Sequence, residues 1–206
     1  MFHMPSFSLC TDADKNITIA QPQTVINEII ENKEDIYDEK SREVQEKMAG
    51  LDEITDTLTR FIEYKDLVNE YSGWFDPPET VYDYFNEDEV YIIQRCVETE
   101  TFEKDFDSKV NVANVIFNRI EHEDFDDTAI EVVTKKKQFA YGRKIISYDT
   151  VLAVEYAFQF GDTTQGALYF HSNKKTDKFY GADYLFTDDA GHHFYGYKEV
   201  NEEGEG

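Results

Sequence analysis

One glutamate in this 206-residue sequence, Glu100, stands where a carboxyl group could serve as a general acid. It ends one apolar helical pattern and precedes a second segment, Val110–Ile120, that is apolar on nearly all sides. Burial against such helices penalises the charged form of a carboxyl group, which can then keep its proton near neutral pH and donate it to a leaving group. The chain has 44 Asp and Glu residues, so position alone separates Glu100 only weakly from Glu98 or Glu103.

Three helices are expected to position this acid. Asn86, with Glu89 three residues later, forms a capping-box signature that opens the helix leading to it. A second helix is predicted over Ser108–Ile120, and its apolar circumference indicates a central place in the domain. A third is predicted over Tyr148–Phe160, where Gly161 provides the C-terminal stop.

Beyond residue 161 the pattern changes from helix to strand. Ala167–His171, Tyr184–Thr187 and His192–Val200 are short and aromatic, and Asp188–Gly191 reads as the turn between the last two. These segments predict a small antiparallel sheet that follows the helices. The expected fold class is therefore α+β and mostly helical.

The N-terminal part has a different pattern. Residues 24–71 lack interior proline breaks and place apolar residues at steps of three and four, which predicts amphipathic helices divided near Gly50. Residues 44–62 come close to a heptad seam, so this arm could dock on a partner, pair between two copies or pack as a hairpin on its own domain. The expected domains are a lead and helical arm (1–78), a catalytic domain (79–200) and a flexible tail (201–206).

Composition excludes several function classes. The formal net charge of −24 repels a phosphate backbone, and Lys135–Lys137 is the one dense basic run, so nucleic-acid binding is not expected. No apolar run approaches the length of a membrane span. Cys10 and Cys96 do not suggest a disulfide framework. The first residues lack a basic start and a sustained apolar run, so no secretory signal is expected.

Four sequence blocks, in order, resemble the SleB-like cell wall hydrolases. The apolar helix that ends in Asn118-Arg119 follows Glu100 at the same sequence spacing as in the family. Gln138-Phe139 is similar to the Gln-Phe pair that the family has after a variable loop. Gly166–His171 resembles its aromatic strand, and Thr187–Phe194 resembles its closing segment, with His192 at the histidine position.

The resemblance implies a lysozyme-like cleft that cleaves the bond between N-acetylmuramic acid and N-acetylglucosamine, as a lytic transglycosylase without a cofactor. Glu100 would protonate the glycosidic oxygen and then take a proton from the muramic acid 6-hydroxyl as an anhydro ring closes. An intramolecular nucleophile needs no second carboxylate; hydrolysis remains the alternative outcome. Glu98 and Glu103 then become bystanders. The expected substrate-binding residues are Gln138, Phe139, Tyr169, His171, Tyr180, His192 and Phe194.

The chain departs from the family pattern at two places. The family often has Ala, Gly and Glu where this chain has Thr101, Glu103 and Lys104, and Ala190-Gly191 replaces its Gly-Asn. These changes concern the local loop shape. A zinc site from His171, His192 and the nearby aspartates is not predicted, because no HExxH-type motif is present.

The expected partners are peptidoglycan strands and, through residues 24–71, virion or tail proteins of a bacteriophage; a homo-oligomer is also open. Without a secretory signal, the protein would act as a virion-associated lysin, or as an endolysin held in the host cytoplasm until it reaches the wall. Two other classes remain open: a metal-dependent N-acetylmuramoyl amidase, and a catalytically inactive structural or interaction protein of a virion.

Overall fold

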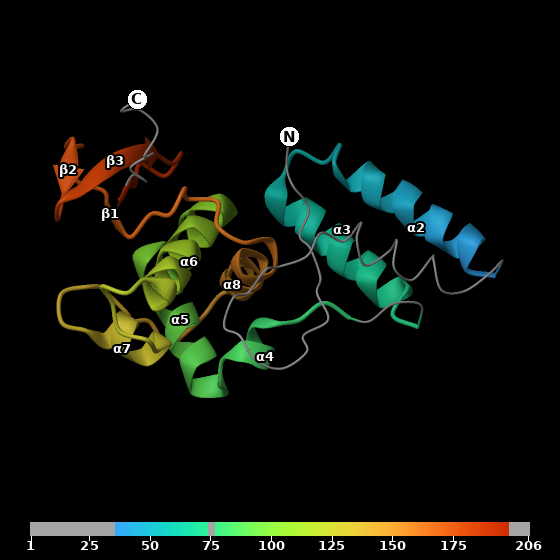
Figure 1. Ribbon diagram of the computed structural model, residues 1–206, viewed down its shortest axis with the longest axis horizontal. Helices are drawn as coiled ribbons and strands as arrows, with labels where there is room; N and C mark the ends of the chain where they lie inside the picture. The colour runs from blue at the N-terminus through green and yellow to red at the C-terminus, as the bar shows by residue number, and fades with distance from the viewer. Residues whose placement is uncertain (1–35, 74–76, 198–206) are drawn as a thin grey trace, which may run out of the picture. The chain divides into compact units, whose positions relative to one another are not determined.

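The computed structural model describes residues 36–73 and 77–197, which divide into two compact units (Figure 1). The first unit contains residues up to Phe85 together with Phe158–Gly161, and the second contains the rest. The expected N-terminal lead, the helical pattern before Ile36 and the C-terminal tail lie outside the described residues. The domain limits at 78 and 200 stay predictions.

In the first unit, helices α2 (Ile36–Leu51) and α3 (Thr57–Glu70) lie side by side and are followed by the short helix α4 (Val81–Tyr84) (Figure 1). The division falls at residues 52–56 rather than at Gly50, which stays inside the last turn of α2. Asp56 sets this boundary, because its side chain accepts the Thr59 backbone N–H at 2.7 Å and caps α3. The turn interrupts the expected seam over residues 44–62, and the two helices form a hairpin.

Four helices make up most of the second unit: α5 (Glu87–Glu100), α6 (Phe106–Glu121), α7 (Ala129–Thr134) and α8 (Tyr148–Phe160). The last residues of α8 group with the first unit. The predicted capping box is present, since Asn86 accepts the Glu89 backbone N–H and Glu89 accepts that of Asn86. Helix α6 buries residues on all sides, as its pattern predicted. The six-residue α7 was not predicted.

A four-stranded antiparallel sheet completes this unit, with the order β1-β4-β3-β2. The strands are β1 (Tyr169–His171), β2 (Lys178–Phe179), β3 (Ala182–Thr187) and β4 (His193–Gly196). One face packs Phe170, Phe186 and Phe194 against Val115 of α6. The predicted fold class, mostly helical α+β with a small antiparallel sheet, is confirmed; the two-residue β2 is an addition to it.

Candidate active site

Glu100 is the last residue of α5, and its side chain is half-buried. Its Oε1 atom accepts a hydrogen bond from the Ala140 backbone N–H at 2.5 Å, so one carboxyl oxygen is engaged and the other is left to carry a proton. Burial raises the pKa of Glu100, against the opposing effects of the Ala140 hydrogen bond and of electrostatic interactions with His192 and Arg119. A raised pKa is what a carboxyl group needs to act as a general acid at neutral pH.

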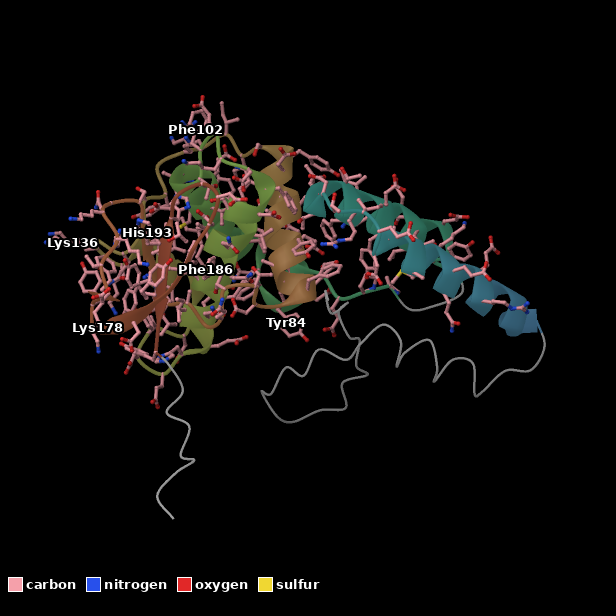
Figure 2. The ribbon with its side chains drawn as sticks, turned by 90° about the horizontal axis from the view of Figure 1, so that it is seen from above. Tyr84, Phe102, Lys136, Lys178, Phe186 and His193 are labelled. Atoms are coloured by element: carbon pink, nitrogen blue, oxygen red, sulfur yellow. The ribbon has the colours of Figure 1, made fainter. Side chains whose placement is uncertain are left out.

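The loop that supplies Ala140 is fixed to the end of α5 by side chains of that helix. Thr99 Oγ1 accepts the Arg143 backbone N–H at 3.0 Å, and Arg95 Nε donates to the Arg143 carbonyl at 2.9 Å. The Arg143 guanidinium in turn covers Phe102, which projects from the connection after α5 (Figure 2). Because these contacts hold the loop along the helix, the Ala140 amide is held at Glu100.

Glu98, which the sequence did not separate from surface glutamates, is buried and helps to fix the same loop to α5. Its Oε2 atom accepts hydrogen bonds from Ser147 Oγ at 2.7 Å and Thr150 Oγ1 at 2.5 Å, and Lys109 Nζ lies 3.7 Å away. Burial alone would raise the pKa of Glu98, but the hydrogen bonds and the Lys109 charge outweigh it and lower the pKa. Glu98 is therefore an ionised structural partner.

This assignment predicts a pH effect of Glu98→Gln on stability. A carboxyl group whose pKa is lowered by folding stabilises the protein above its unfolded pKa, and that contribution is lost as the pH falls through the folded pKa. The wild-type melting temperature should therefore fall more steeply on acidification than that of Glu98→Gln, and the variant should be less stable at pH 7. Thermal unfolding between pH 3 and 7 measures this. Parallel curves would contradict the assignment.

The Asn118-Arg119 pair at the end of α6 fixes the backbone that enters the sheet. Asn118 Nδ2 donates to the Ala167 carbonyl at 3.0 Å, and Arg119 Nε donates to the next carbonyl, that of Leu168, at 2.6 Å. Arg119 Nη1 also donates to Gln138 Oε1 at 3.0 Å. The guanidinium lies between three aromatic rings, those of Phe125, Phe139 and Tyr169. Burial lowers the pKa of Arg119 to about 10, which leaves it charged at neutral pH.

His192 directly precedes β4 and is 4% exposed. Its Nδ1 atom lies 3.0 Å from Ser108 Oγ and 3.2 Å from Asp188 Oδ2, while its ring packs edge-on against Phe170. Asp188 also accepts the His192 backbone N–H at 2.8 Å, which closes the predicted turn. Sequence reasoning treated Asp188 as a turn residue and did not single out Ser108.

The two departures from the family pattern meet in space. Lys104 Nζ donates to the Ala190 carbonyl at 3.0 Å, which ties the connection after α5 to the turn before His192. Glu103 has φ +61°, a conformation that favours glycine, and the family's glycine corresponds to this position. Thr101 is fully buried, and its hydroxyl donates a hydrogen bond to the Val97 carbonyl at 2.5 Å. In this chain the loop is held by these contacts.

The expected substrate-binding residues fall into two groups. Gln138, Phe139 and Tyr169 contact Arg119. His192 contacts Ser108 and Asp188 instead. His171 and Tyr180 both contact the Phe179 ring, and Tyr169 joins this aromatic cluster through Tyr180 at 5.5 Å between ring centres. Phe194 has no exposed surface and stacks on Phe186, so its ring packs in the core.

An acidic pocket of about 420 Å³ opens near this site, lined by Asp105, Asp107, Asn111, Phe186, Asp188 and Asp189. Glu100 is not part of its lining. Its carboxylates disfavour an anionic ligand. Among the residues that the structure describes, no group of three or more His, Cys, Asp or Glu side chains is arranged to hold a metal ion. Within the same ranges, no helix is long and apolar enough to cross a membrane.

Residues 103–196, less than half of the chain, match the family described as Cell Wall Hydrolase. The match agrees with the predicted resemblance to cell wall hydrolases over this part of the chain. Glu100 lies three residues before the matched range. A comparison with curated proteins found no match.

The chain is also similar to two solved structures. One is the catalytic domain of the Bacillus cereus SleB protein, with 19% identity, 54% of this chain and 91% of that chain covered, and a TM-score of 0.48. The other is the catalytic domain of the germination-specific lytic transglycosylase SleB from Bacillus anthracis, with 19% identity, 55% and 98% covered, and a TM-score of 0.49. Phage origin, virion attachment and localisation stay predictions.

Proposed function

We propose that this domain cleaves the bond between N-acetylmuramic acid and N-acetylglucosamine as a lytic transglycosylase, with Glu100 as its one catalytic carboxyl group. The observation that carries the proposal is the setting of Glu100: half-buried, with a raised pKa and with one oxygen held by the Ala140 amide. Such a group is protonated in the pH range where an ordinary surface glutamate is ionised.

The neighbouring carboxylates have other tasks. Glu98 accepts hydrogen bonds from Ser147 and Thr150 beside Lys109, and Asp188 is bound to His192 and Ser108. Hydrogen bonds lower the pKa of both groups against the opposing effect of burial, so both are ionised partners within the protein. Because both carboxylates are held by hydrogen bonds within the protein, a mechanism with one catalytic carboxyl group is favoured over one that needs a second carboxylate as nucleophile or base.

The reaction then has two proton transfers through the same group. Glu100 donates its proton to the glycosidic oxygen as the bond from that oxygen to the muramic acid C1 breaks. The 6-hydroxyl of the same muramic acid attacks C1, and its proton passes to the Glu100 carboxylate. The products are a 1,6-anhydromuramic acid end and a free sugar hydroxyl, and Glu100 is protonated again. The attacking hydroxyl is part of the substrate, so its effective concentration is high.

Mass analysis of the products released from purified sacculi tests the proposal. Wild-type protein should release anhydro-muropeptides, and Glu100→Gln should release none above the background. Reducing muramic acid ends that depend on Glu100 would make the enzyme a muramidase instead. Release of free stem peptides, abolished by a chelator and unaffected by Glu100→Gln, would overturn the proposal in favour of an amidase.

A further inference from the structure

The segment between α7 and α8 is basic in an otherwise strongly acidic chain. Residues 135–148, the basic loop, contain five of the chain's 20 Lys and Arg residues and no Asp or Glu, although the formal net charge is −24. The five are Lys135, Lys136, Lys137, Arg143 and Lys144. A charged run on a surface loop often serves solubility alone, so the contacts and the position of these residues decide whether they form a binding surface.

Three lysines of the basic loop keep their charge free for a partner. Lys135 Nζ lies 2.8 Å from Asp126 Oδ2, which neutralises it. Lys136, Lys137 and Lys144 are exposed, and none of the three forms an ion pair with a carboxylate in the part of the chain that the structure describes. The side chain of Lys136 extends outward from the ribbon (Figure 2). These three charges therefore face solvent without a counter-charge.

The free lysines lie on both sides of the amide that binds the proposed acid. The Ala140 backbone N–H donates to Glu100 Oε1 at 2.5 Å. Lys137 precedes Ala140 by three residues, and Lys144 follows it by four. Because consecutive Cα atoms are 3.8 Å apart, both lysine Cα atoms lie within about 15 Å of the Ala140 Cα atom. A ligand that is bound at Glu100 is thus close to a positive charge on either side.

Contacts along its length hold the basic loop in one conformation. Near its start, Gln138 Oε1 accepts a hydrogen bond from Arg119 Nη1 at 3.0 Å. In the middle, both the N–H and the carbonyl of Arg143 are bound by side chains of α5. Near its end, Ser147 Oγ donates to Glu98 Oε2 at 2.7 Å. The loop backbone is therefore ordered before a ligand arrives, which reduces the entropy lost on binding.

The basic loop also exposes apolar surface. Ile145 is 87% exposed and Tyr148 is 69% exposed, and they are two of the three most exposed large apolar side chains among the described residues. Cations beside apolar side chains suit a ligand that combines anionic groups with apolar ones. The net charge of the chain repels anions elsewhere, so this loop is the surface that attracts them toward Glu100.

We propose that the basic loop binds the peptide stem of peptidoglycan, with Lys136, Lys137 and Lys144 on the stem carboxylates and with Ile145 and Tyr148 on its alanine methyl groups. The inference rests on the proposed function, because the muramic acid that is cleaved at Glu100 carries the stem on its lactyl group. Phosphate polymers of the wall are anionic as well. A polymer joined to the muramic acid 6-hydroxyl, however, occupies the group that closes the anhydro ring, so the stem is the ligand that fits this reaction.

Sedimentation with purified sacculi tests the proposal. The sacculi are first freed of phosphate polymers with hydrofluoric acid, and the Glu100→Gln protein is used so that the glycan stays intact. Adding Lys136→Gln, Lys137→Gln and Lys144→Gln together should raise the Kd about tenfold at low salt, because three exposed charge contacts are lost. Salt at about 0.5 M should weaken binding of the parent protein toward that of the variant, since it screens exposed charges.

Two controls separate the basic loop from net charge and the carboxylates from other groups. Lys174→Gln, Lys175→Gln and Lys178→Gln remove the same charge from exposed lysines of the same compact unit, and binding should stay within about twofold. Sacculi whose carboxyl groups have been converted to methylamides should bind the parent protein and the loop variant equally.

Several outcomes would overturn the proposal. These are unchanged binding in the loop variant, equal losses in both triple variants, a loss that persists on methylamide sacculi, and a loss seen only on sacculi that keep their phosphate polymers. Anhydro-muropeptide release by the wild type, together with unchanged binding in the loop variant, leaves the proposed function standing without this inference. Weaker binding in the loop variant, together with release of stem peptides that does not need Glu100, keeps the ligand of the loop and overturns the proposed function.

Discussion

Glu100→Gln is expected to slow the degradation of purified peptidoglycan by about 10²–10⁴-fold, because general acid catalysis contributes that much to bond cleavage. Glutamine has nearly the same shape and can still accept the Ala140 N–H, which the wild-type carboxyl oxygen accepts at 2.5 Å. It cannot donate a proton to a leaving group. The initial rate of turbidity loss of a sacculus suspension measures the effect.

Glu103→Gln is the matched control. Glu103 is exposed and lies three residues further along the chain, so the same change in charge is made close by without touching the buried carboxyl group. Its rate should stay within about twofold of the wild type, as surface substitutions change little. A Glu100→Gln protein that keeps more than a tenth of the wild-type rate would contradict the assignment, as would equal losses in both variants.

Glu100→Gln should also stabilise the folded protein at neutral pH. Burial raises the pKa of Glu100, so the stability that its protonated form contributes is present below the unfolded value, 4.5, and is lost as the pH rises through the folded pKa. Glutamine does not ionise and avoids that loss. The Glu100→Gln protein should therefore melt at a higher temperature than the wild type at pH 7, with a smaller difference at pH 4. Catalytic groups often carry such a cost in stability.

Local sequence rules predicted the long elements because their signals are local. Helices α5, α6 and α8 follow from the Asn86 cap, the apolar circumference of α6 and the stop at Gly161. The six-residue α7 and the two-residue β2 are too short for a periodic pattern. The break between α2 and α3 was misplaced at Gly50, because glycine tolerates a helix interior, whereas the Asp56 cap defines the start of α3.

The sequence could predict only those site residues whose residue type itself indicates a chemical role. The resemblance and the apolar setting selected Glu100, and the raised pKa agrees with that selection. Its closest partner is a backbone N–H of Ala140, and no side-chain type marks such a donor in a sequence. Glu98, Ser108 and Asp188 take their roles from residues at least four and as many as 84 positions away, so only the folded chain distinguishes them from other polar residues.

Arg119→Lys is expected to have the largest effect on stability, lowering the free energy of unfolding by about 2–4 kcal/mol although the charge is kept. Lysine has no planar fork, so it cannot donate to Leu168 and Gln138 together as the guanidinium does at 2.6 and 3.0 Å. It also gives up the stacking between the rings of Phe125, Phe139 and Tyr169. Denaturant unfolding at neutral pH measures the loss, which should appear in the midpoint.

Arg95→Lys is the control that shows how much of the stability lost in Arg119→Lys comes from burial of the guanidinium. Arg95 also donates Nε to a backbone carbonyl, that of Arg143 at 2.9 Å, and lies over Tyr91 and Tyr141, but it is only half-buried. Water can replace its lost hydrogen bond, so Arg95→Lys should cost about 1 kcal/mol or less. Arg119 has no such replacement, and its loss releases the loop from Gln138 onward, which holds the Ala140 amide at Glu100. Activity should therefore fall with stability in Arg119→Lys, and equal midpoints for the two lysine variants would show that the buried guanidinium does not organise the site.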